Sequence, residues 1–267
     1  MVLKKAVLAA LLCLAAGLLP GCTGHNASLR LSGSTSMEEL AKAFAEDCGQ
    51  EVDVQFGGSS VGIRNVLTGV SQIGMVSRAL LPEETGLSAV TVALDPICIA
   101  VSRKNPVQNL TDAQIAAIFT GQIGNWSELG GPDCGIAVIG QEAGSGTRDA
   151  FEGCFGITGK AAYHQELSGT GMASAAVAAA PGGIGYLSLT YLGEGVRAVR
   201  INGIACTQKN ARDGSYPVIR PFLFVTRAGE ASDAVRQFLA YACSERGRTI
   251  VEQLGLTVPP GEECRCG

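Results

Sequence analysis

Residues 138–148 read VIGQEAGSGTR, a short apolar run that enters a Gly/Ser/Thr loop at the start of a helical segment. The same order occurs as LRLSGSTS at residues 29–36 and as VQFGGSS at residues 54–60. Such a turn presents unpaired backbone N–H groups, hydroxyl donors and the positive end of a helix dipole, which together suit an anion. A single serine or threonine there is more often only a helix cap. Three such turns at the carboxyl ends of strands predict an anion site at the edge of an α/β sheet.

The rest of the chain agrees with an α/β fold, because short β-branched or alternating apolar runs exchange with segments of helical period. A capping box at Ser36 and Glu39 is expected to open the first helix, and a second box at Thr111 and Gln114 a later one. The other predicted helices cover residues 174–180 and 233–243. The predicted strands are residues 29–31, 52–56, 90–94, 97–101, 136–139, 196–201 and 218–225.

Composition excludes several classes of protein. The chain has 267 residues, a formal net charge of −4 and 46% hydrophobic residues. With no basic surplus, binding to nucleic acid is not expected, and the apolar content argues against intrinsic disorder. His25 and His164 are the only histidines, so catalysis by several histidines and a His-rich metal site are both excluded.

The N-terminal residues predict export. Two lysines precede an apolar run over residues 6–19, which is too short for an ordinary membrane-spanning helix and suits the core of a signal peptide. The run ends in LPGC at residues 19–22, which resembles a bacterial lipobox with Cys22 as the lipid-modified residue. We expect residues 1–21 to be a signal peptide and residues 22–27 to be a lipid-anchored tether. Ordinary signal cleavage nearby is the alternative.

Cysteine usage agrees with an oxidising compartment. Apart from Cys13 in the signal and Cys22 at the anchor, eight cysteines remain, an even number that allows up to four disulfides. Cys134 and Cys154 are the preferred local pair. The C-terminal Cys264 and Cys266 have no nearby Cys or His to complete a metal site. Disulfide bonds that hold the C-terminal tail are therefore favoured over metal binding. These eight are Cys48, Cys98, Cys134, Cys154, Cys206, Cys243, Cys264 and Cys266.

The loop around Ser145 does not match the spacing of known catalytic or nucleotide-binding motifs. A nucleophile elbow at Ser145 would need glycine two residues before and two residues after it, where the chain has Ala143 and Thr147. The loop also lacks the lysine of a P-loop and the last glycine of a dinucleotide-binding fingerprint. His164 could still serve Ser145 as a base, but an isolated histidine is more often a packing or surface residue. We expect no enzyme activity, no catalytic residues, no cofactor and no metal.

The chain resembles the phosphate-binding lipoproteins of bacterial ABC transporters over nearly all of the predicted mature sequence. The most specific feature is the loop Gly144-Ser145-Gly146-Thr147 followed by Arg148. The other segments that carry the resemblance are residues 33–36, 57–62, 73–78, 110–126 and 183–186.

The resemblance implies a type II periplasmic binding protein, in which two α/β lobes joined by two crossing segments close over one oxyanion. The crossings are expected near residues 100–103 and 217–222. Lobe one would then comprise residues 28–99 and 222–267, and lobe two residues 100–221.

The resemblance also implies a set of anion ligands made of backbone amides and hydroxyls. Arg148 would supply a charge-assisted donor, although an ion pair with Glu152 four residues later is the alternative. Arg78 is assigned in the same way. The remaining implied ligands are Ser34 or Thr35, Ser59 or Ser60, Ser77, Ser145, Gly146 and Thr147.

The chain departs from the family pattern just before the loop. Residues 141–143 are Gln-Glu-Ala where many relatives have Arg-Glu-Glu or Arg-Ala-Asp, and Gln72 stands where relatives often carry aspartate. A buried carboxylate can accept a hydrogen bond from the proton of hydrogenphosphate, whereas it repels sulfate, which has no proton. Loss of the acidic residue therefore bears on selectivity for phosphate over sulfate. Glu142 and Asp149 remain as acceptors, but solvation or pairing with Arg148 is favoured for both.

We therefore expect a monomeric, lipid-anchored receptor on a bacterial membrane that captures inorganic phosphate and delivers it to a membrane permease and its ATPase. A receptor for another oxyanion, such as sulfate or molybdate, is one alternative. A sensor or matrix module that performs no transport is another, and an exported hydrolase that uses Ser145 is the least favoured.

Overall fold

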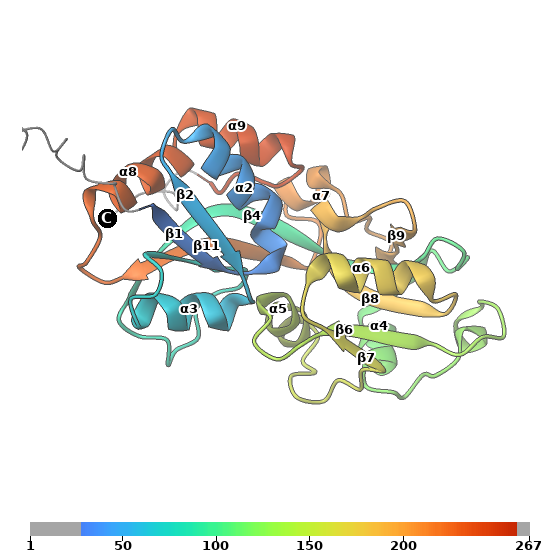
Figure 1. Ribbon diagram of the computed structural model, residues 1–267. Helices are drawn as coiled ribbons and strands as arrows, with labels where there is room; N and C mark the ends of the chain where they lie inside the picture. The colour runs from blue at the N-terminus through green and yellow to red at the C-terminus, as the bar shows by residue number, and fades with distance from the viewer. Residues whose placement is uncertain (1–27, 261–267) are drawn as a thin grey trace, which may run out of the picture.

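A computed structural model of the protein describes residues 28–260. Its strands form one continuous curved sheet in the order β2-β1-β3-β11-β4-β8-β6-β7, with β9 added beside β4 (Figure 1). A separate parallel pair is formed by β5 and β10. The strands are β1 (Leu29–Gly33), β2 (Val52–Phe56), β3 (Ile73–Val76), β4 (Leu87–Ser102), β5 (Asn109–Leu110), β6 (Ala137–Gln141), β7 (Gln165–Leu167), β8 (Gly183–Ser188), β9 (Val196–Ala198), β10 (Arg200–Ile201) and β11 (Ile219–Arg227).

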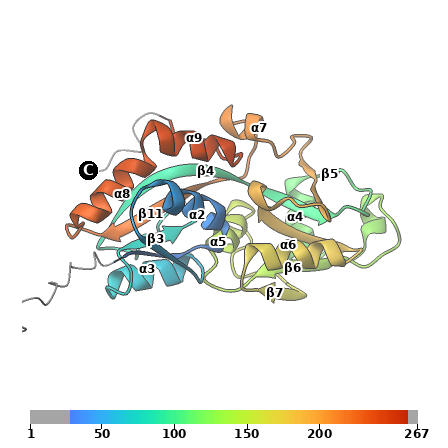
Figure 2. The same cartoon turned by 45° about the horizontal axis from the view of Figure 1, so that its top comes forward.

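Helices cover both faces of this sheet, as Figure 2 shows from a second direction. On the first half, α2, α8 and α9 cover one face and α3 the other. On the second half, α6 lies on one face and α4 and α5 on the other. The helices are α2 (Glu38–Asp47), α3 (Ser59–Leu67), α4 (Asp112–Phe119), α5 (Gly146–Cys154), α6 (Thr170–Ala179), α7 (Gln208–Arg212), α8 (Asp233–Ala242) and α9 (Glu245–Gln253), with 3-10 turns η1 (Thr35–Met37), η2 (Trp126–Leu129) and η3 (Leu189–Tyr191).

Alternation along the strands explains these layers, since neighbouring side chains of a strand point to opposite faces. On β11, Phe222 and Phe224 belong to the core under α2, α8 and α9, whereas Leu223 and Val225 pack with α3. On β6, Val138 packs in the core with α4 and α5, and its neighbour Ile139 packs with α6. Each half of the sheet thus has a core of its own, and we refer to the halves as lobe one (β1–β3) and lobe two (β6–β8).

Two long strands, β4 and β11, connect the lobes. Residues 87–96 of β4 pair with β11, and residues 97–101 pair with β8 of lobe two. The change of partner falls at Pro96, which has no N–H to donate to a ladder. It comes a few residues before the crossing expected near residues 100–103. The other expected crossing, residues 217–222, contains Ile219, which pairs with Pro96.

Several predicted elements are confirmed and others are corrected. Strand β2 has the predicted bounds, and both hydrogen bonds of the Thr111–Gln114 capping box are present. The predicted strands 90–94 and 97–101 are one strand, β4, and the predicted strand 196–201 is two, β9 and β10. The capping box at Ser36 is wrong, because the cap of α2 is Met37 and makes no side-chain hydrogen bond. Ser34 instead caps the preceding turn η1.

A disulfide is present as expected, but the preferred pairing of Cys134 with Cys154 is wrong. Cys98 is bonded to Cys206, which is 108 residues away, and Cys134 and Cys154 are both free thiols. The Cys134 Sγ points to the Gly135 carbonyl, whereas the Cys154 Sγ lies beside the Pro217 carbonyl, so nearness in sequence did not bring the two together. Cys22, Cys264 and Cys266 lie outside the described residues.

No helix within residues 28–260 has the length and apolar character needed to cross a bilayer. In the same part of the chain, no three His, Cys, Asp or Glu side chains are grouped as ligands for a metal ion.

Candidate functional site

The three Gly/Ser/Thr loops meet where the two lobes face each other. The loop after β1 contacts the loop after β2, since the N–H groups of Gly57 and Gly58 both donate to the Gly33 carbonyl at 2.9 and 3.0 Å. The loop after β6 joins them from lobe two, where the Gly144 carbonyl accepts from the Ser60 N–H at 3.1 Å. The convergence predicted from the sequence is thus present in the fold.

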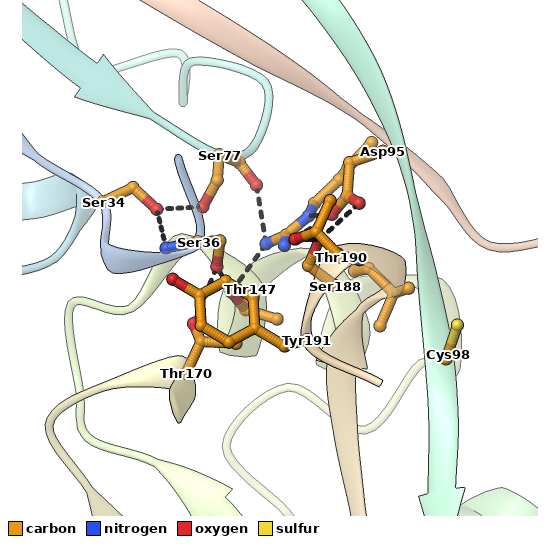
Figure 3. A network of polar contacts seen from close by, with 12 residues as sticks. Ser34, Ser36, Ser77, Asp95, Cys98, Thr147, Thr170, Ser188, Thr190 and Tyr191 are labelled. Atoms are coloured by element: carbon orange, nitrogen blue, oxygen red, sulfur yellow. Dashed lines mark hydrogen bonds and ion pairs between the residues drawn. The ribbon is translucent and has the colours of Figure 1, made fainter. Parts of the chain in front are cut away.

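Hydroxyl groups from both lobes form two adjacent buried hydrogen-bonded sets, which together we call the hydroxyl cluster. On lobe one, Ser34 Oγ donates to Ser77 Oγ at 2.8 Å, and Ser77 Oγ lies 3.3 Å from Ser59 Oγ. Across the lobes, Ser36 Oγ lies 2.7 Å from Thr147 Oγ1 and 3.0 Å from Thr170 Oγ1. Figure 3 shows Ser34 and Ser77 above, Thr147 and Thr170 below, and Ser36 between them. The cluster comprises Ser34, Ser36, Ser59, Ser77, Thr147 and Thr170.

Local structure fixes these hydroxyls. Ser59 and Thr147 lie in the first turns of α3 and α5, whose N-termini both face the junction between the lobes. Ser34 precedes η1, and its Oγ accepts the Ser36 N–H at 3.3 Å. The Ser77 N–H donates to Ser59 Oγ at 3.0 Å. Helix N-termini and hydroxyl donors therefore point at one small volume that is shielded from water.

Arg220 is the arginine that reaches this cluster. It lies on β11 directly opposite Asp95 of β4, and its side chain is only 2% exposed. Its Nη1 donates to Thr147 Oγ1 at 2.6 Å and to the Ser77 carbonyl at 3.2 Å. One guanidinium therefore touches a residue of each lobe, at the strands that join them.

Asp95 holds this guanidinium in place on the side that faces away from the hydroxyl cluster. Arg220 Nε donates to Asp95 Oδ2 at 2.8 Å, and Ser188 Oγ donates to Asp95 Oδ1 at 2.7 Å. Arg220 Nη2 lies 2.7 Å from the same Asp95 oxygen, so two nitrogens of the guanidinium pair with this carboxylate. Burial raises the pKa of the Asp95 carboxyl and lowers the pKa of the Arg220 guanidinium, because each charged form loses hydration. Their mutual attraction opposes both shifts.

The two arginines singled out from the sequence are engaged elsewhere. Arg78 donates from Nε to Asp149 at 2.8 Å and from Nη1 and Nη2 to Glu84 at 2.7 Å each, so all three of its nitrogens are used. Asp149 lies on lobe two, which makes this pair a link between the lobes. Asp149 therefore pairs with Arg78, and not with Arg148 as the sequence suggested.

Arg148 points away from the cluster. Its Nε donates to Glu152 Oε1 at 2.8 Å, which is the ion pair along the helix that the spacing allowed. Its Nη1 donates to Glu166 Oε2 at 2.9 Å, and the guanidinium lies 4.8 Å above the Tyr163 ring. Nearby carboxylates and the hydrogen bonds that they accept raise the pKa of Arg148 against the opposing effect of burial.

The other predicted ligands surround the cluster. Gly146 starts α5 and is buried against it, whereas Thr35 reaches it at the edge, with Oγ1 3.2 Å from Thr170 Oγ1. Ser60 contributes its N–H to the bond between the lobes. Ser145 caps α5, and its Oγ donates to Gln141 Oε1 at 2.6 Å. His164 is instead bonded to the Val138 N–H at 3.1 Å, so it does not serve Ser145 as a base.

Sequence reasoning missed Ser36, Thr170 and Arg220 in this site. Thr170 gave no signal, because it lies outside the three loops. Arg220 did give one: it is a charged residue inside an apolar strand, as is Asp95 on the strand that pairs with it. A charge in such a place is rarely buried without a partner.

Comparisons with known proteins agree with this geometry. A family model for the PBP superfamily domain matches residues 23–246. The phosphate-binding protein PstS of Bacillus subtilis is 35% identical over 237 residues, which are 82% of this chain and 76% of that protein.

The chain is also similar to solved structures of phosphate-binding transport proteins. A phosphate ABC transporter substrate-binding protein of Clostridium perfringens, solved with bound phosphate, is 38% identical, with a TM-score of 0.83 over 87% of this chain and 99% of that one. A phosphate transport receptor of Vibrio cholerae is 32% identical, with a TM-score of 0.73 over 87% of this chain and all of that one. These relatives are binding proteins of transport systems and not enzymes. The chain therefore belongs to the PBP superfamily, as a two-lobed type II periplasmic binding protein of the phosphate-binding family.

Proposed function

We propose that the protein is an extracytoplasmic receptor that captures inorganic phosphate between its lobes and delivers it to an ABC transporter. The names of its relatives support the ligand and the transport role. The observation that carries the proposal is Arg220, a buried guanidinium that donates into a cluster of hydroxyls drawn from both lobes. An anion bound there would be held by both lobes at once, so that binding favours closure.

The cluster has the chemistry of an oxyanion site. Serine and threonine hydroxyls donate hydrogen bonds to phosphate oxygens and can also accept a hydrogen bond from the P–OH group of hydrogenphosphate. Arg220 supplies the charge-assisted donor, and the N-termini of α3 and α5 add partial positive charge. The proposed ligands are the hydroxyls of Ser34, Ser36, Ser59, Ser77, Thr147 and Thr170, the Gly146 amide and Arg220, with Thr35, Ser60 and Ser145 around them.

Calorimetry tests this proposal directly. Titration of phosphate into protein stripped of bound anion is expected to show one site per chain, because the cluster is a single volume shared by the lobes. No carboxylate accepts a hydrogen bond from the cluster hydroxyls among residues 28–260. Repulsion of sulfate is therefore expected to be weak, and a large excess of sulfate should raise the apparent Kd for phosphate.

The other outcomes separate the alternatives. Sulfate or molybdate that binds more tightly than phosphate would make the protein a receptor for that oxyanion. Absence of binding by all three anions would contradict a receptor and favour a sensor or matrix module on the same fold.

We propose further that Cys22 anchors the exported, monomeric protein to a bacterial membrane through a lipid. The Cys22→Ala variant is expected to incorporate no labelled fatty acid and to be released in soluble form, because the cysteine that carries the lipid is missing. Cys48→Ala is the matched control, since Cys48 is a thiol of the folded domain. Labelling that persists in Cys22→Ala would contradict the anchor.

A further inference from the structure

A cavity of about 410 Å³ opens on lobe two. It lies between the segment that follows β4, strands β9 and β10, and the chain around Cys206. Its volume falls in the range of roughly 300–1,000 Å³ that is typical of small-molecule sites. Arg103 follows the last residue of β4 and lies six residues beyond Ile97, where β4 enters lobe two, which corresponds to about 20 Å of extended chain. None of the residues of the hydroxyl cluster lines this cavity.

The cavity has a strong positive charge. Arg103, Arg197 and Arg200 line it, and no aspartate or glutamate does. None of the three has an ion pair within residues 28–260, although seven arginines elsewhere in that range do. Three uncompensated guanidiniums around one concave site repel one another. An anion that enters the site would relieve that repulsion.

Arg197 is held in position by main-chain atoms. Its Nε and Nη2 donate to the carbonyl oxygens of Asn105 and Val107, and its Nη1 makes no hydrogen bond to a described residue. Its guanidinium is thus fixed without being neutralised. Burial lowers its pKa from the ordinary value, which for an arginine still leaves it charged at neutral pH.

Asn105 also lines the cavity, and its side chain carries an unpaired donor that is buried beneath the wall. Its side chain is 3% exposed, and its Oδ1 accepts the Val107 N–H at 2.9 Å, which identifies the other end of the amide as the NH₂ group. That Nδ2 has no hydrogen-bond partner. A buried donor without a partner is costly in a folded protein and is satisfied by a suitable acceptor.

The opposite wall is rigid. The disulfide between Cys98 and Cys206 ties the chain around residue 206 to β4. The Gly203 N–H donates to Asn109 Oδ1, which joins the same chain to β5. Preorganised walls lower the ordering cost of binding.

We propose that this cavity is a second anion site, which takes a compact polyanion with at least two charged oxyanion groups, of the pyrophosphate type. Three guanidiniums from three segments of the chain, the turn after β4 and strands β9 and β10, are best neutralised together by a ligand with more than one negative group. The site is separate from the cluster that we assign to phosphate, so each can be tested with the other unchanged.

Calorimetry with pyrophosphate as the probe tests this site while saturating phosphate occupies the hydroxyl cluster. One pyrophosphate is expected to bind per chain, more weakly as salt is raised. The double variant Arg103→Gln/Arg200→Gln removes two exposed guanidiniums and should weaken pyrophosphate binding by about tenfold or more, with phosphate binding unchanged. Arg248→Gln is the matched control, an exposed arginine of α9 on lobe one.

Two results would overturn the proposal. One is the absence of pyrophosphate binding once phosphate saturates the hydroxyl cluster. That result would mean that pyrophosphate binds only at the hydroxyl cluster and not in the cavity. The other is equal pyrophosphate affinity in the double variant and in Arg248→Gln. If phosphate does not bind at the hydroxyl cluster, the cavity can still be tested. Pyrophosphate binding is then measured without phosphate and compared between the double variant and Arg248→Gln.

Discussion

The Arg220→Met variant is expected to bind phosphate about a hundredfold more weakly than the parent protein, since the loss of a buried charge-assisted donor costs about 3 kcal/mol. Arg220 is the only arginine of the described chain that donates into the hydroxyl cluster, at 2.6 Å from Thr147 Oγ1. Methionine keeps the unbranched stem of the side chain but removes the charge and the donors. Calorimetry with phosphate measures the change.

The same substitution would leave the Asp95 carboxylate buried without its partner, which typically costs about 3–5 kcal/mol of folding stability. A second variant, Arg220→Met/Asp95→Asn, separates the two effects. Its neutral amide can still accept the Ser188 hydroxyl, so much of the stability should return while phosphate binding stays weak. Arg227→Met, at an exposed position of the same strand, is the control. Parent-like phosphate affinity in the double variant would remove Arg220 from the site.

The Gly146→Ala variant is expected to bind phosphate more weakly, because the added methyl group would keep the two lobes from closing on each other. A Cβ at this position would lie 2.2 Å from Ser59 Oγ and 2.7 Å from Ser77 Oγ, both of which belong to the opposite lobe. Forcing such a contact costs about 1–3 kcal/mol, which is a factor of roughly 5 to 150 in Kd. Alanine is also the better helix former by up to about 1 kcal/mol, so the unliganded protein should remain as stable as the parent.

Thermal unfolding with and without phosphate distinguishes this effect from misfolding. The Gly146→Ala variant should unfold near the parent temperature without phosphate and should gain little stability when phosphate is added. Gly153→Ala, in the same helix, is the control, because a Cβ there has no neighbour within 4 Å. A Gly146→Ala variant that phosphate stabilises as much as Gly153→Ala would show that the lobes do not close on this residue.

Local patterns in the sequence predicted most of the elements that frame the site. Strand β2 and the capped start of α4 follow from a few neighbouring residues, because alternation and capping are local interactions. Pairing between distant residues is not local. The choice of Cys206 as the partner of Cys98, and the union of two predicted strands into β4, depend on which segments the folded sheet brings together.

The sequence by itself determined the α/β class, the three Gly/Ser/Thr loops and the chemistry of their hydroxyl and amide donors, since residue type and spacing along a strand or helix suffice for these. The tertiary structure alone decided which cation serves the site. Arg78 and Arg148 stand beside the loops in sequence, but each has carboxylates within reach in the fold. Arg220 lies far from the loops in sequence, and only the pairing of β11 with β4 places it opposite Asp95 and against Thr147. The position of a charge in a binding site depends on the partners that surround it in space, which the order of residues along the chain does not specify.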